Sequence, residues 1–180
     1  MSHGAPLLVF ALNVQAPPLR QLLVPMQAAG FPVALGTGIV GEAGAEALDS
    51  PEWDAAFIRW NQPEMHEVAL LERMVCDEDE EGMVRVTEAM NQVLQWEDQV
   101  GRLIVAAHLQ QTQAVYALQL LDALFTDEDH PAWGAFDILL RVLADYTDGL
   151  IYVEGEGYLD ADGELLLSEE DAPASPGKSV

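Results

Sequence analysis

Short, almost continuously apolar segments dominate the hydrophobic pattern of this chain. Residues 7–14 (LLVFALNV) and 103–109 (LIVAAHL) carry hardly any polar side chain. Segments of this kind are typical of strands that are buried on both faces of a sheet. Further strands are expected where short apolar or alternating runs occur, at residues 31–35, 54–61 and 150–153.

The segment 67–75 (EVALLERMV) fits either a strand or a helix. Val68, Leu70 and Met74 would share one face of a strand, although apolar positions three and four apart would also suit a helix. We favour the strand, because it would form a hairpin with residues 54–61 through a short connection.

Four segments have the apolar spacing of helices. They are residues 19–29, 83–100, 112–125 and 131–147. Gly30, Gly101 and Gly149 would end the first, second and fourth of them, and five consecutive acids at 77–81 suit the positive N-terminus of the second.

The C-terminal part of the chain predicts a hairpin followed by a tail. Residues 160–163 (DADG) have the composition of a tight turn, and residues 164–167 would form the returning strand. Residues 168–180 are acidic and rich in Pro and Gly, which is typical of a disordered tail.

These elements predict one α/β or α+β domain of two to three layers over residues 1–167. Its sheet would be mixed, with about five to seven strands, and four helices would pack on it. The apolar segments 7–12 and 103–108 are similar and each precedes a helix. Two similar halves, each containing a βαβ unit, are therefore an alternative description of the domain.

The net charge of the chain narrows the classes of partner to consider. The chain has 7 Lys and Arg against 31 Asp and Glu, which gives a formal net charge of −24 at pH 7. Such a surface repels nucleic acids and anionic membranes and attracts basic partners. A single cysteine, no basic stretch before the first apolar run and no apolar run near 20 residues together predict a cytoplasmic protein.

The sharpest motif is GTGIVG at residues 36–41, in which Gly36, Gly38 and Gly41 follow a predicted strand. Over residues 31–61 the sequence resembles the dinucleotide-binding fingerprint of Rossmann-type proteins. The resemblance implies that these glycines let the backbone approach a pyrophosphate. Asn61 stands where the fingerprint has an acidic residue, and a glycine-rich surface loop would explain the same letters.

Acidic side chains beside a histidine offer a second kind of site. Asp127, Asp129 and His130 lie together, and Glu154 and Glu156 would share one face of a predicted strand. Either group has the residue types that bind a divalent cation or act as an acid–base pair. The alternative interpretations are a helix cap for the first group and a solvent-exposed strand face for the second.

No nucleophile elbow, C-x-x-C pair or H-E-x-x-H zinc motif occurs in the sequence. The leading hypothesis is therefore a protein-binding module without enzymatic activity or cofactor, such as an adaptor, a chaperone-like carrier or an immunity-type inhibitor. Its partner would be a protein, favourably a basic one, and a homodimer is a further arrangement to consider. The alternatives are a small nucleotide-binding protein that uses the glycine loop and a carboxylate- or metal-dependent enzyme.

Overall fold

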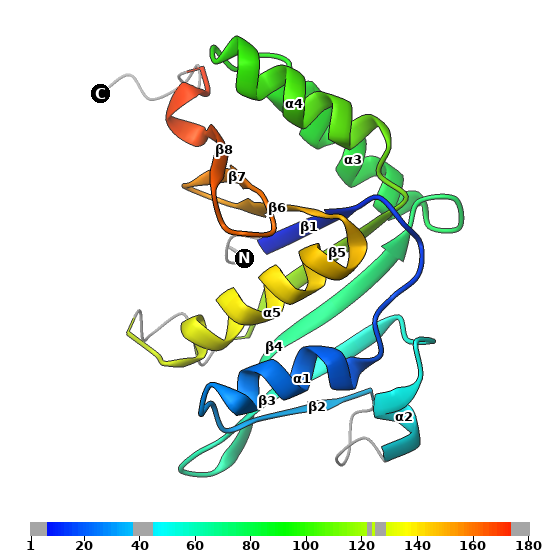
Figure 1. Ribbon diagram of the computed structural model, residues 1–180, viewed down its shortest axis with the longest axis vertical. Coiled ribbons are helices and arrows are strands. Elements are labelled where there is room, and N and C mark those ends of the chain that lie inside the picture. The colour runs from blue at the N-terminus through cyan, green and yellow to red at the C-terminus, as the bar shows by residue number, and fades with distance from the viewer. Residues whose placement is uncertain (1–6, 38–44, 122–123, 125–128, 174–180) are drawn as a thin grey trace.

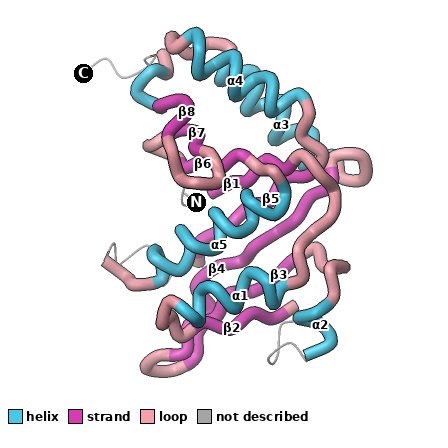
Figure 2. Tube along the Cα trace, in the orientation of Figure 1, coloured by secondary structure: helices cyan, strands magenta, loops and turns pink. Residues whose placement is uncertain are grey.

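The computed structural model describes residues 7–37, 45–121, 124 and 129–173, and in it one sheet runs through the whole molecule (Figures 1 and 2). The strands are β1 (Leu7–Ala11), β2 (Val33–Gly36), β3 (Ala55–Asn61), β4 (Met65–Val75), β5 (Ala114–Leu120), β6 (Leu150–Val153), β7 (Gly157–Leu159) and β8 (Leu165–Ser168). Their order in the sheet is β2-β3-β4-β5-β1-β6-β7-β8, and every neighbouring pair is antiparallel.

Helices cover both faces of this sheet. They are α1 (Leu19–Ala28), α2 (Ala45–Asp49), α3 (Glu80–Val93), α4 (Gln99–Gln110) and α5 (Ala132–Thr147), followed by a 3₁₀ helix (Glu169–Asp171). One face carries α1 and α5, and the opposite face carries α3 and α4, so the molecule has three layers (Figure 1).

The central strand β1 explains why two cores form. Its side chains alternate between the faces, so that Leu7 and Val9 belong to the core under α1 and α5. Leu8 and Phe10 belong to the core under α3 and α4. The prediction of a strand buried on both faces is thus confirmed for residues 7–11 of the predicted range 7–14, because a strand with helices on both sides needs apolar residues at every position.

Several predicted elements are confirmed. The segment 67–75 lies in β4 and pairs with β3, and α1 and α5 occupy the first and fourth predicted helices. Asp148, with φ of 50°, ends α5 in the left-handed conformation. Gly149 follows, and a Cβ there would lie 2.7 Å from Val9 Cγ1, so the close approach of α5 to β1 requires glycine.

The middle of the chain corrects the sequence prediction. Residues 103–109 lie in α4 and are not a strand, and residues 114–120 are strand β5 where a helix was expected over 112–125. The proposed similarity between residues 7–12 and 103–108 is therefore wrong, because the first is a strand and the second a helix. The error arose because α4 is apolar on two sides, which hides its helical period.

The predicted helix 83–100 is in fact two helices, α3 and the start of α4. Leu94 ends α3, and Asp98 caps α4 by accepting a hydrogen bond from the backbone N–H of Val100 (3.1 Å). Gly101 does not end a helix but lies inside α4, where a Cβ would come within 2.5 Å of Asp98 Oδ2.

The C-terminal hairpin is present with one strand more than predicted. Gly163, with φ of +82°, closes the predicted turn by donating its N–H to Asp160 O (3.0 Å), between β7 and β8. The part of the predicted tail that is described, up to residue 173, continues the fold as the end of β8 and the 3₁₀ helix, and residues 174–180 lie outside the described part.

The overall class, helices packed on one sheet, agrees with the prediction, but the details differ. The sheet is antiparallel rather than mixed, with eight strands instead of five to seven, and the described residues form five α-helices instead of four. Within the described ranges, no helix has the length and apolar character that crossing a bilayer requires.

Candidate functional site

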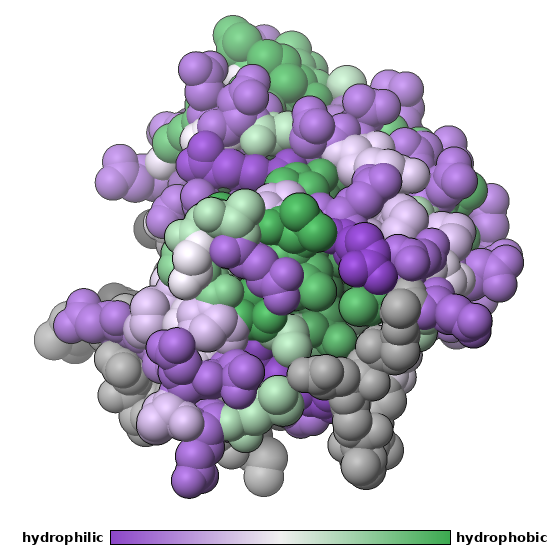
Figure 3. All heavy atoms as spheres, turned by 60° about the horizontal axis from the view of Figure 1, so that its bottom comes forward, coloured by the Kyte–Doolittle hydropathy of each residue, from purple (hydrophilic) through white to green (hydrophobic). Residues whose placement is uncertain are grey.

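Exposed apolar side chains gather on the α3–α4 hairpin. Ten large hydrophobic side chains are exposed among the described residues, and six of them lie on α3, on α4 or on the connection between the two helices. We call these six the hairpin face; they are Met83, Val84, Leu94, Val100, Leu103 and Ile104. Apolar atoms are visible at the upper end of the molecule in Figure 3, towards which α4 lies in Figure 1.

Helix α4 is apolar on two opposite sides. Its inner side buries Val105 and Leu109 against the sheet. Its outer side presents Val100, Leu103 and Ile104, and Val100 is 69% exposed. A helix that is apolar all round is normally buried, and a contiguous exposed apolar patch marks an interaction site more often than single exposed residues do.

The hairpin is held firmly on the sheet. Asp79 caps α3 by accepting the N–H of Glu81 (2.9 Å). Near the end of α4, His108 Nε2 lies 2.8 Å from the carbonyl oxygen of Phe10 in β1; since a carbonyl only accepts, Nε2 carries the hydrogen. Trp96, between the helices, packs on Tyr158 of β7 with ring centroids 5.7 Å apart.

Acidic groups lie at both ends of the hairpin. Residues 77–110 contain eight carboxylates and two arginines, with five of the carboxylates at 77–81 and two more at 97–98. Arg85 forms an ion pair with Glu81 (3.1 Å), and Arg102 donates to the carbonyl oxygen of Trp96 (3.2 Å). Both cations are thus engaged within the protein, and the surroundings of the hairpin face are negative.

The predicted glycine site lies mostly outside the described residues. Gly36 is the buried last residue of β2 and pairs with Phe57 of β3, whereas Gly38 and Gly41 are not described. A dinucleotide-binding βαβ unit has parallel strands, but β2 and β3 are antiparallel and α2 between them has only five residues. Nucleotide binding by this loop stays a prediction.

The predicted acid–histidine group is partly described. Asp127 is outside the described residues, and Asp129 is exposed. The Nδ1 atom of His130 accepts the N–H of Ala132 at the start of α5 (3.0 Å), which is the capping role considered for this group. The ring of His130 also lies 6.2 Å, between centroids, from His66 on β4, a contact that the sequence did not predict.

Glu154 and Glu156 do not share a strand face, because residues 154–156 form the turn between β6 and β7. Glu154 lines a cavity beside Arg85 and Tyr152, whereas Glu156 lines another beside α5. In the described part of the chain, no three His, Cys, Asp or Glu side chains come close enough to hold a metal ion.

Three side chains, those of Cys76, Tyr152 and Tyr158, have raised pKa values, which favour their neutral forms. Burial, with the carboxylate of Asp77 as a second cause, raises the pKa of the Cys76 thiol. Burial, followed by Glu169, raises the pKa of Tyr152 to about 12, and burial also raises the pKa of Tyr158. None of these three is prepared as a nucleophile or a general base near neutral pH.

Comparison with protein-family models, with curated proteins and with solved structures finds no match for this chain. The hairpin face is therefore the candidate functional surface on physical grounds alone. Sequence reasoning missed it because residues 103–109 were interpreted as a strand. The signal was present: apolar residues at 100, 103, 104 and 107 have the spacing of one helix face.

Proposed function

We propose that this protein is a protein-binding module that docks an apolar, basic segment of its partner on the hairpin face. It would act as an adaptor, a chaperone-like carrier or an immunity-type inhibitor does, by occupying a surface of another protein. The observation that carries the proposal is the concentration of six of the ten exposed large hydrophobic side chains on one helical hairpin.

The apolar contribution to binding follows from exposure. Burying a Val, Leu or Ile side chain completely contributes about 1.5–3 kcal/mol, and the side chains of the hairpin face are roughly half-exposed before binding. Val100 and Ile104 together would then contribute about 2–3 kcal/mol, which corresponds to roughly 30- to 150-fold in affinity.

The acidic ends of the hairpin favour a basic partner over a second copy of this chain. The hairpin has carboxylates at both of its ends, so a second copy docked in either antiparallel or parallel orientation would place acids against acids. Two chains with a net charge of −24 each would also repel one another. A partner with Lys or Arg at both ends of an apolar helical segment complements this surface, because opposite charges steer association and fix the register.

The proposal can be tested with two designed helical peptides as probes. Both carry the same leucine stripe, and one has lysines where the other has glutamates. Binding is followed by the amide signals of the ¹⁵N-labelled protein. We expect the Leu/Lys peptide to shift the signals of α3 and α4, and the Leu/Glu peptide to leave them unchanged.

Matched variants locate the effect. The double variant Val100→Ser/Ile104→Ser removes two members of the hairpin face, and Val24→Ser removes a valine that is 51% exposed on α1 in the opposite layer. We expect the double variant to bind the Leu/Lys peptide roughly 30-fold more weakly or worse, and Val24→Ser to bind it normally. Equal binding by the two variants would show that the hairpin face is not the docking surface.

A further inference from the structure

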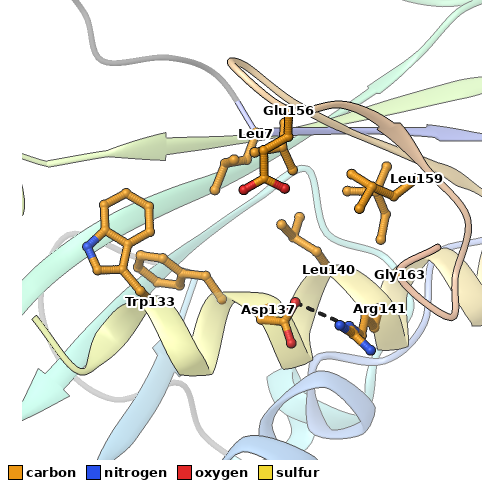
Figure 4. A pocket seen from close by; sticks show the side chains of 11 residues that line it. Leu7, Trp133, Asp137, Leu140, Arg141, Glu156, Leu159 and Gly163 are labelled. Atoms are coloured by element: carbon orange, nitrogen blue, oxygen red, sulfur yellow. Dashed lines mark hydrogen bonds and ion pairs between the residues drawn. The ribbon is translucent and has the colours of Figure 1, made fainter. Parts of the chain in front are cut away.

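A cavity of about 240 Å³ lies on the opposite side of the sheet from the hairpin face, between α5 and strands β1, β6 and β7 (Figure 4). We infer that it binds a small organic cation with an apolar body, such as an arylalkylamine. The inference is independent of the proposed protein-binding function, because none of the residues that line the cavity belongs to the hairpin face.

The walls of the cavity are mainly apolar. Phe136 and Leu140 contribute from α5, and Leu7, Ile151 and Leu159 contribute from the sheet. Apolar walls with a few polar groups are the usual composition of small-molecule sites. The volume lies below the roughly 300–1,000 Å³ that is typical for drug-sized ligands, so the cavity suits a molecule with a single ring.

Aromatic rings stand at one end of this space. Trp133 packs edge-on against Phe136, with centroids 6.0 Å apart and an interplanar angle of 83°. Both residues line the cavity, and in Figure 4 the Trp133 ring lies at its edge, next to the first turn of α5. The faces of such rings attract ammonium groups, most strongly where water is partly excluded.

The positive charge in the lining, on Arg141, is partly compensated by protein groups. Arg141 Nε donates to Asp137 Oδ1 (3.2 Å), and its Nη1 donates to the carbonyl oxygen of Asp162 (3.0 Å). Gly163 permits this arrangement, because a Cβ there would lie 2.6 Å from Arg141 Nη2. Two of the three guanidinium nitrogens are thus bonded to protein oxygens, while the Arg141 side chain stays 46% exposed.

Glu156 supplies the remaining charge. It lies in the turn between β6 and β7, and Figure 4 shows its carboxylate facing α5 across the cavity. Its carboxylate has no hydrogen-bond or ion-pair partner among the residues that the structure describes. With the net charge of −24 acting in the same direction, a cation is attracted to this site and an anion is repelled.

Three phenyl-substituted probes test the inference at pH 7: 2-phenylethylamine and 2-phenylethanol, which have the same number of non-hydrogen atoms, and the slightly larger 3-phenylpropionate. Binding is followed by the amide signals of α5 and β6 and by tryptophan fluorescence. We expect the amine to bind, the alcohol to bind at least threefold more weakly, and the carboxylate to bind most weakly. Equal affinities, or no shifts at α5 and β6 with any probe, would overturn the inference.

Two charge-neutralising variants provide the matched pair. Glu156→Gln should weaken binding of the amine at least threefold and leave the alcohol unchanged, whereas Glu154→Gln, in the same turn but beside the other cavity, should change neither. An amine affinity that is insensitive to Glu156→Gln would overturn the role of this carboxylate. Val100→Ser/Ile104→Ser should bind the amine normally, so that failure of the cavity and failure of the hairpin face are told apart.

Discussion

Two tryptophans allow a direct test of how buried hydrogen bonds stabilise this fold. Trp53 is 5% exposed, packs on Tyr116 of β5 with centroids 5.8 Å apart, and donates its Nε1–H to the carbonyl oxygen of Pro17 (2.8 Å). The Nε1 atom of Trp133 is also buried, but it has no hydrogen-bond partner among the described residues. Each tryptophan is replaced by phenylalanine in turn.

The two substitutions should differ in cost. Trp53→Phe leaves the Pro17 carbonyl without its donor, which costs about 1–3 kcal/mol, and the smaller ring forfeits roughly 1 kcal/mol of apolar burial. The expected loss of unfolding free energy is about 2–4 kcal/mol. Trp133 is only partly buried, so Trp133→Phe forfeits at most about 1 kcal/mol of apolar burial, and it removes a buried unsatisfied donor that costs about 1–3 kcal/mol. Its net effect should therefore lie between no change and a gain of about 2 kcal/mol.

Urea unfolding followed by far-ultraviolet circular dichroism measures both variants at pH 7. We expect the urea concentration at the unfolding midpoint to be clearly lower for Trp53→Phe than for Trp133→Phe. The slope of the unfolding free energy against urea concentration should be the same for both variants. Equal losses, or a larger loss for Trp133→Phe, would refute the reasoning that the Pro17 hydrogen bond distinguishes the two sites.

Two further predictions concern stability. Burial lowers the pKa of His108 despite its bond to the Phe10 carbonyl, so below about pH 6.5 the unfolded chain binds a proton that the folded chain does not. The free energy of unfolding should therefore fall as the pH falls below that value, and His108→Gln should reduce this fall. Unfolding measured as a function of pH checks this, and parallel profiles for the wild type and the variant would contradict it. Gly157, with φ of +124°, faces the backbone of Leu167, and Gly157→Ala should cost about 2 kcal/mol or more. Gly155, with φ of +87° and open space around it, is the control, and Gly155→Ala should cost only about 1–2 kcal/mol in thermal unfolding. A Gly157→Ala variant as stable as Gly155→Ala would be inconsistent with the close approach of Gly157 to the Leu167 backbone.

The first strand and the helix at 131–147 were predicted well. Residues 7–11 of the apolar segment 7–14 form β1, which needs apolar residues on both faces because helices cover both. The helix at 131–147 has a proline at its start and a glycine after its end, and α5 follows these signals closely.

The middle of the chain was not predictable by the same rules. Residues 103–109 look like a buried strand because one side of α4 packs on the sheet and the other side carries the exposed Leu103 and Ile104. In β5, residues 114–118 are buried at every position, so the alternation that identifies a strand is missing. The exposed apolar side of α4 removes the amphipathic signal, so the residues of the hairpin face are themselves the reason why the sequence pattern misled.

The candidate sites show a related limit. The turn at 154–156 separates Glu154 from Glu156 and directs them to different cavities, although their spacing suggested a shared face. The cavity beside α5 joins residues from both ends of the chain, such as Leu7 and Glu156, which no local pattern connects. Charge, by contrast, could be read from composition alone, and a net charge of −24 predicts repulsion of nucleic acids whatever the fold.

The most direct test of the central claim uses the natural partner. The tagged chain captures proteins from a lysate of the source organism, and the captured proteins are identified and produced in pure form. Each is then titrated against the wild type, Val100→Ser/Ile104→Ser and Val24→Ser at low and at moderate salt. We predict a 1:1 complex with a basic protein that weakens with salt, weakens roughly 30-fold or more in the double variant and is unchanged in Val24→Ser. A complex of the same affinity with all three proteins, or a chain that associates only with itself through the hairpin face, would contradict the claim.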